Sequence, residues 1–135
     1  MRFGIKIRDR RSGGANSFLS FDLRDILEAA GEPVLTSRWR CRDLCYTAAR
    51  GGRFDEFREA RRKLNGEEMV RFAAGIHQTL DGRFEARAAG AARRPWLIIL
   101  AVDGAWFEVW SSKRAVLERV RARFGEVSDL PAAAA

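Results

Sequence analysis

The sequence predicts an α+β fold: a single domain with a mixed or antiparallel sheet, a C-terminal three-strand meander and helices packed mainly on one face. Two observations predict this class. Stretches in which apolar residues alternate with polar ones, as in half-buried strands, are interspersed with stretches in which apolar residues recur every three or four positions, as in amphipathic helices. The 135 residues also match the length of one domain. We therefore expect one domain over residues 1–127 and a disordered tail over 128–135.

In the N-terminal part of the chain, apolar spacing and turn residues define the expected elements. Phe3, Ile5 and Ile7 alternate with basic residues, which is typical of a strand with one buried face. Asp22 precedes a run with helical apolar spacing, and Gly31 closes it, as in a capped helix. We predict a strand over 2–8, a loop over 9–16, a short strand over 17–21, a helix over 23–30 and a long strand over 34–47.

Two helices are expected in the middle of the chain. The first, over 53–64, has its phenylalanine and leucine residues on one side. The second, over 66–80, begins where Asn65 and Glu68 have the spacing of a capping box, and a stripe of apolar residues follows. Asp81-Gly82 is expected to end this helix, because Gly is common just after a helix C-terminus.

The last third of the chain predicts a three-strand meander followed by a helix. Asp103-Gly104 is a typical two-residue hairpin turn between two apolar stretches. This turn predicts a register in which Val102 lies opposite Ala105, and Leu100 lies opposite Phe107. The expected elements are strands over 83–87, 96–102 and 105–111, and a basic amphipathic helix that begins after Ser112.

The chain is strongly basic. It contains 22 Arg and 3 Lys against 18 acidic residues, which gives a net charge of +7. Such a surface attracts nucleic acid, anionic lipid or acidic proteins without specifying which of them. No apolar stretch approaches the roughly 18 residues of a membrane helix, and the charged N-terminus lacks the apolar segment of a signal peptide. We therefore expect a soluble cytoplasmic protein, and the Arg- and Ala-rich composition suggests a bacterial origin.

Glu108 lies between Trp106 and Trp110 on one side of the predicted hairpin. Helices on both faces of the sheet would make both tryptophans core residues, and a buried Glu108 would then need an arginine partner. A sheet with one open face would instead make them an exposed aromatic patch, which marks a partner surface. We take Trp106, Glu108 and Trp110 as candidate partner-binding residues, and protein–protein contact or self-association as the expected function.

Rows of arginine favour an alternative function, nucleic-acid binding. Arg38, Arg40 and Arg42 alternate along the predicted strand, so that their side chains lie about 6.6 Å apart on one face and can follow successive phosphates. A charged sheet face or edge that only opposes aggregation would carry the same pattern. The final helix adds further bases around an apolar stripe that is also suited to packing on the sheet. Those bases are Arg114, Arg119, Arg121 and Arg123.

Cys41 and Cys45 are the two cysteines of the chain. On a straight strand they lie about 13 Å apart, which is too far for a disulfide bond. The chain also has a single histidine, His77, so that it lacks the four ligands typical of a structural zinc site. We therefore expect buried free thiols, no metal and no cofactor.

Catalysis is a third alternative, for which His77, Asp81 and Glu108 are the best available residues. A nuclease would need acids on adjacent strands beside a base, and Asp81, Glu85 and Arg87 are the nearest approach to that arrangement. We identify no phosphate-binding glycine loop, no nucleophile motif and no motif of a known family. The sequence therefore favours a non-catalytic binding module over an enzyme.

Overall fold

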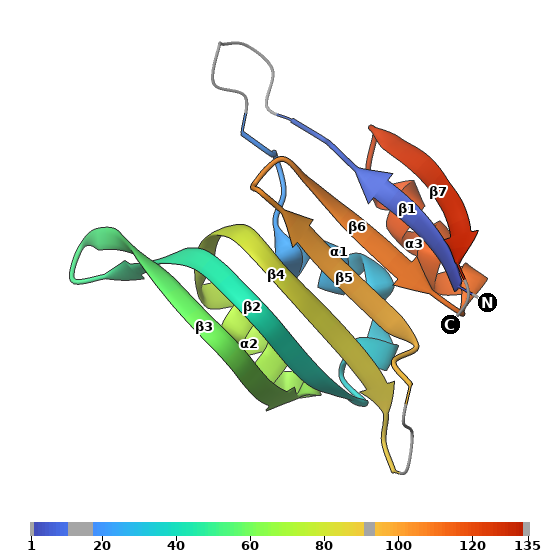
Figure 1. The fold of residues 1–135 in the computed structure, drawn as a ribbon, viewed down its shortest axis with the longest axis horizontal. Helices are drawn as coiled ribbons and strands as arrows, with labels where there is room; N and C mark the ends of the chain where they lie inside the picture. Colours follow the sequence, from blue (N-terminus) through green and yellow to red (C-terminus); the bar gives the residue numbers. More distant parts are fainter. Residues whose placement is uncertain (1, 11–17, 91–93, 134–135) are drawn as a thin grey trace.

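The computed structural model describes residues 2–10, 18–90 and 94–133. Within them, seven strands form one antiparallel sheet in the order β3-β2-β4-β5-β6-β1-β7, and three α-helices lie behind one of its faces (Figure 1). The expected α+β class is confirmed. The elements are β1 (Arg2–Ile7), α1 (Leu23–Ala30), the 3₁₀ helix η1 (Glu32–Val34), β2 (Ser37–Arg50), β3 (Arg53–Asn65), α2 (Gly66–Gly75), β4 (Ile76–Ala88), β5 (Leu97–Val102), β6 (Trp106–Ser111), α3 (Arg114–Arg123) and β7 (Val127–Ala133).

The β2–β3 hairpin is the largest departure from the expected elements. The helix predicted over 53–64 is wrong, because these residues form β3, which pairs with β2 along its length. Gly51 and Gly52 have φ angles of 57° and 81°, which suit a tight hairpin turn with both central residues in the left-handed region. This turn places Arg53 opposite Arg50 and starts a long ladder. The ladder outweighs the intrinsic helix propensity of the segment.

The helix predicted over 66–80 is shorter than expected. It begins with the predicted capping box, in which the side chains of Asn65 and Glu68 each accept a hydrogen bond from the backbone N–H of the other residue. It ends at Gly75, and the chain continues directly into β4. Asp81-Gly82 therefore lies within a strand and not at the end of a helix.

The meander β4–β5–β6 is present, but its second turn differs from the predicted one. Val102 pairs with Trp106, so that three residues and not two connect β5 to β6. Asp103 opens this turn with a φ of 53°. The register shifts by one residue, which exchanges the two faces of β5 relative to β6. As a result, Ile98 and Leu100 share a face with the two tryptophans of β6. The predicted register instead placed the residues adjacent to Ile98 and Leu100 in the sequence on that face.

The two ends of the described chain lie side by side in the sheet. β1 lies between β6 and β7, so that the first described strand is an interior strand next to the β7 edge of the sheet (Figure 1). The disordered tail predicted over 128–135 is wrong for its described part, because Val127–Ala133 forms β7. Pairing with β1 holds this segment, in which only Val127 and Leu130 are large apolar residues, and these two do not alternate as in a typical strand. Residues 134–135 lie outside the described part.

The described residues between β1 and α1 contain little regular structure. Of the short strand predicted over 17–21, the described residues form only an isolated bridge between Leu19 and Arg10. Residues 11–17, which include most of the predicted loop, lie outside the described part. Beyond the bridge, Asp22 caps α1 and also accepts hydrogen bonds from the backbone N–H and the hydroxyl of Thr79 in β4, at 2.9 and 2.5 Å. Asp22 therefore ties α1 to the sheet, and its burial raises the pKa of its carboxyl group.

Asp43 interrupts the alternation of side chains along β2. Its φ is 53°, and the buried positions change from odd numbers before it, such as Trp39 and Cys41, to even numbers after it, such as Tyr46. Cys45 therefore lies on the face opposite to Cys41, although residues four positions apart on a regular strand share a face. The apolar core lies between the helices and the face that carries Trp39.

Candidate functional site

The candidate site is the face of the sheet that the helices leave uncovered. Cross-strand partners point to the same face, so that the register defines which residues share it. We call this surface the open face. It is defined by Arg2 and Lys6 of β1, Arg38, Arg40 and Arg42 of β2, Arg61 and Lys63 of β3, Arg83, Glu85 and Arg87 of β4, Ile98, Leu100 and Val102 of β5, and Trp106, Glu108 and Trp110 of β6.

The basic part of the open face spans β3, β2 and β4. The three arginines predicted to form a row, Arg38, Arg40 and Arg42, are all exposed there. Each has a cross-strand neighbour on both sides, and most of these neighbours are also basic. Where β2 begins and β3 ends, a hollow of about 470 Å³ is lined by four bases, Arg38, Arg40, Lys63 and Arg87, and by one acid, Glu68. The fold therefore brings bases from three strands into one region that suits an anionic ligand.

Glu85 organises the centre of this basic region. It is only 4% exposed. Its carboxylate accepts a hydrogen bond from Arg83 Nε at 2.9 Å and lies 3.4 Å from Arg87 Nη1 and 3.8 Å from Arg42 Nε. Burial alone would raise the pKa of Glu85, but the hydrogen bond and the charges of these arginines lower it below its ordinary value. Glu85 therefore stays ionised and holds three guanidinium groups in place.

The aromatic part of the open face lies on β6. Glu108 accepts a hydrogen bond from Trp106 Nε1 at 3.1 Å and another from Trp110 Nε1 at 3.0 Å, one on each carboxylate oxygen. Lys6, the cross-strand neighbour of Glu108, places its Nζ 3.9 Å from the ring centroid of Trp106. The tryptophans are half-buried, so that neither interpretation from the sequence holds fully. The sheet has an open face, yet the two indoles lie against it.

Gly4 makes room for Trp110. The two residues are cross-strand neighbours, and a Cβ atom on Gly4 would lie 2.5 Å from Cε3 of the indole. We expect Gly4→Ala to displace the Trp110 ring and to break its hydrogen bond to Glu108. A red shift of tryptophan emission with little loss of stability would show this displacement. Unchanged emission would contradict the close packing of Trp110 on Gly4.

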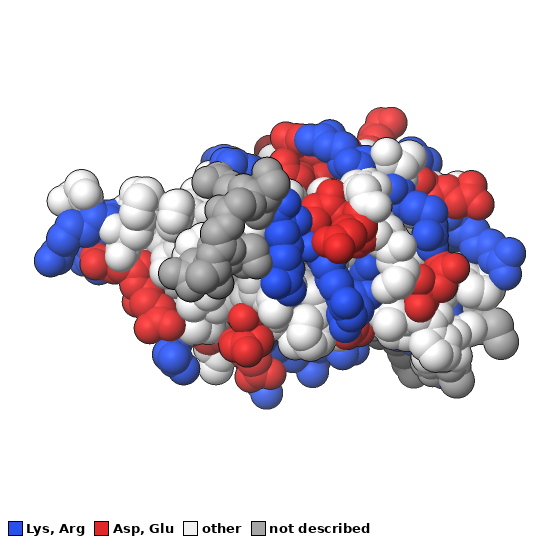
Figure 2. Space-filling model, turned by 90° about the horizontal axis from the view of Figure 1, so that it is seen from above, with Lys and Arg blue, Asp and Glu red and all other residues white. Residues whose placement is uncertain are grey.

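The arginines of α3 do not join the open face. They lie in the helical layer and already have partners there. The partners are the Phe3 ring for Arg114, the Ala30 carbonyl for Arg119, Asp129 for Arg121, and Asp25 and Glu28 for Arg123. Seen from above, acidic and basic side chains are interspersed on the surface of the molecule (Figure 2). These four arginines therefore do not form one surface with Arg38, Arg40 and Arg42.

The three residues considered for catalysis have separate roles in the structure. His77 is exposed on β4 and stacks on Phe54, with ring centroids 3.8 Å apart. Asp81 accepts a hydrogen bond from the backbone N–H of Asp103 and so supports the β5–β6 turn. Glu108 orients the tryptophans. No contact joins His77, Asp81 and Glu108 among the described residues, and no group of three metal-ligating side chains occurs there.

Both cysteines are buried free thiols, as predicted. Burial raises the pKa of Cys41 to about 12. Cys45 lies 3.1 Å from a carboxylate oxygen of Glu56, and burial together with this contact raises its pKa as well. Neither thiol is therefore activated as a nucleophile.

Sequence reasoning found the two rows of the open face but missed Gly4, Lys6 and the role of Glu85. The alternation of β1 was visible in the sequence, but its neighbours in the sheet were not. The available signal was the alternation of Glu85 with arginines along its own strand. Its role as a shared partner also depends on the pairing of β2 with β4, which the spacing of residues does not show.

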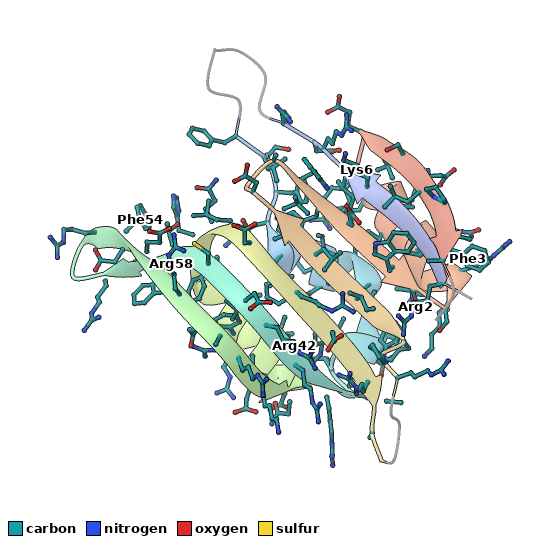
Figure 3. All side chains as sticks on the ribbon, viewed as in Figure 1. Arg2, Phe3, Lys6, Arg42, Phe54 and Arg58 are labelled. Carbon is teal, nitrogen blue, oxygen red and sulfur yellow. The ribbon has the colours of Figure 1, made fainter. Side chains whose placement is uncertain are left out.

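Figure 3 labels Arg2, Lys6 and Arg42 across the open face, from β1 at one side to β2 at the other. No helix in the described part of the chain is long and apolar enough to cross a membrane. Compared with protein-family models, curated proteins and solved structures, the chain matches none of them.

Proposed function

We propose that the protein binds single-stranded nucleic acid through the open face. The observation that supports this best is the composition of the open face itself. Nine of the sixteen residues that define it are basic, and the two carboxylates among these sixteen, Glu85 and Glu108, are both engaged by neighbouring arginines or indoles. An electropositive surface with an adjoining aromatic group is the combination that binds the phosphates and bases of a single strand.

The geometry of the basic region suits a nucleic-acid backbone. Alternate side chains along a strand lie about 6.6 Å apart, and adjacent strands about 4.8 Å apart, so that guanidinium groups form a regular grid. Arginine binds phosphate oxygens through paired N–H donors. A sheet surface can also hold splayed bases, which a duplex does not offer because its bases are stacked inside.

The properties of the tryptophan pair disfavour the protein-partner interpretation. Both indole N–H groups already have an acceptor in Glu108, and Lys6 covers part of Trp106. A protein interface usually centres on exposed apolar anchors. The large apolar residues that are exposed in the described chain lie elsewhere, at Phe18, Leu35, Phe54 and Val70.

A salt titration tests the proposal. We expect an oligothymidylate of twelve nucleotides to bind with a linear dependence of log K on log salt, whose slope is about −0.7 for each phosphate contacted. Replacing Arg38, Arg40 and Arg42 with Ala should reduce the slope by about 2 and weaken binding roughly 100-fold at low salt. Fluorescence anisotropy at several salt concentrations measures both quantities.

The matched control removes the same charge from the helical layer. Arg24, Arg71 and Arg123 are exposed, one on each α-helix, and their replacement with Ala should leave the slope unchanged. Equal weakening by both triple variants would refute a site on the open face. Absence of binding at low salt, or a dimer in light scattering that Trp110→Glu dissociates, would refute the nucleic-acid proposal and favour a protein partner. Equal affinity for duplex would refute the preference for single strands.

A further inference from the structure

A trough in the open face lies between the aromatic and basic regions. Its volume is about 280 Å³. Ile98 and Leu100 of β5 form its floor, Trp110 borders one side and Arg83 of β4 the other. Arg2 of β1 also lines it. The trough thus has an apolar floor, an indole at one side and two cationic side chains. Glu108 also lines it, but both of its carboxylate oxygens already accept hydrogen bonds from the indoles.

The Trp110 wall is held in place before any ligand arrives. Its Nε1 donates to Glu108, and the glycine at position 4 lets the ring lie on the backbone of β1. A Cβ atom there would lie 2.5 to 2.7 Å from three ring atoms, Cε3, Cδ2 and Cζ3. Such similar distances to three atoms mean that the indole presents its face to Gly4. The ring therefore needs little reorganisation to serve as a stacking surface, which favours binding.

The two arginines of the trough are also anchored. Arg2 donates from Nη2 to the carbonyl of Pro95 at 2.8 Å, and Arg83 donates from Nε to Glu85 at 2.9 Å. A guanidinium group carries five N–H donors, so that a single anchoring bond leaves donors for a ligand. Their positive charge at the trough favours an anionic molecule with one flat apolar part.

We infer that one nucleobase of the bound strand lies over the trough and stacks on the face of Trp110 that is turned away from Gly4, with the neighbouring phosphates on the Arg83 side; this inference rests on the proposed function. The volume suits a single base and not a stack, since it lies just below the range of pockets for drug-sized ligands. Trp106 does not extend the stack, because Lys6 lies over its ring. The phosphate backbone then follows β4 and β2, and the base projects toward β6.

An oligonucleotide without bases separates this inference from the proposed function. The two probes are the twelve-nucleotide oligothymidylate and an abasic deoxyribose-phosphate chain of equal length, which carries the same charge. We expect the wild-type protein to bind the abasic chain about tenfold more weakly, a typical effect of one base stacked on an aromatic ring. Trp110→Ala should bind both probes equally. Trp106→Ala, the matched control, should keep the preference for bases.

The possible outcomes are distinct. Equal binding of both probes by the wild type, or an unchanged preference in Trp110→Ala, refutes the stacking of a base on Trp110, while the proposed binding of phosphates stands. Failure of both probes to bind refutes the proposed function and the stacking together. If Trp110→Ala does not fold, the fluorescence of the Trp106→Ala variant decides. Oligothymidylate should quench its emission more than the abasic chain, because the other two tryptophans of this variant, Trp39 and Trp96, are buried in the core. Equal quenching overturns the inference.

Discussion

Gly66→Ala is expected to lower the free energy of unfolding by roughly 3 kcal/mol or more, because the added methyl group would overlap main-chain atoms of a neighbouring segment. Gly66 is the first residue of α2 and packs against the backbone of Leu35, just after η1. A Cβ atom on Gly66 would overlap the carbonyl group of Leu35. Neither segment can move aside easily, because the added Cβ is bonded directly to the main chain of Gly66 and the group that it would overlap is the main chain of Leu35. Chemical denaturation, followed by far-UV circular dichroism, measures the loss.

The other end of the same helix provides the control. Gly75 is the last residue of α2, and no atom lies within 4 Å of the position that its Cβ would occupy. Gly75→Ala should therefore leave stability unchanged or raise it by up to about 1 kcal/mol, because alanine favours the helix. A similar loss for Gly66→Ala and Gly75→Ala would mean that helix propensity, and not contact with Leu35, governs the first position.

Glu85→Gln is expected to lower stability by about 2 kcal/mol at neutral pH, because the arginines around Glu85 lose their counter-charge. The cost stays below that of a fully buried pair, since the side chains of Arg42 and Arg83 are 47% and 42% exposed and can turn toward water. The pKa of Glu85 is lower in the folded protein than in the unfolded chain. Its stabilising contribution is therefore present above about pH 4.3 and is lost as the pH falls through the folded pKa.

Two measurements check this prediction. The difference in unfolding free energy between wild type and Glu85→Gln should shrink as the pH is lowered from 7 to 3, and a constant difference would contradict the role of the charge. The variant should also bind oligothymidylate about threefold more tightly, because one negative charge leaves the basic region. Glu118→Gln makes the same change in net charge on the exposed side of α3 and should alter neither quantity.

Features that depend on neighbouring residues in the sequence could be predicted. The alternation of β1, the capping box at Asn65 and Glu68 and the hairpin after β5 all rest on contacts within a few residues. The same local reasoning failed for β3. Its apolar residues fit helical spacing, and only the turn at Gly51-Gly52 places them against β2. The turn residues therefore indicated a hairpin strand, whereas the spacing of the apolar residues indicated a helix.

The open face could be predicted in its parts but not as a whole. Each row, such as the one that contains Arg40 or the one that contains Trp110, was visible as an alternation along one strand. Their relation depends on the strand order, which places β4 and β5 between them. The partners of Glu85 on β2 and of Trp110 on β1 are also far away in sequence. No local pattern encodes such pairs.

The interior position of β1 has a consequence for how the protein folds. Its two neighbours, β6 and β7, follow it at a long distance in the sequence, and Arg2 pairs with Ala133. During synthesis, β1 therefore stays unpaired until one of these strands has also left the ribosome. Contacts between such distant segments slow folding, because a large loop must close before they form. We therefore expect docking of β1 to be the slow step of refolding.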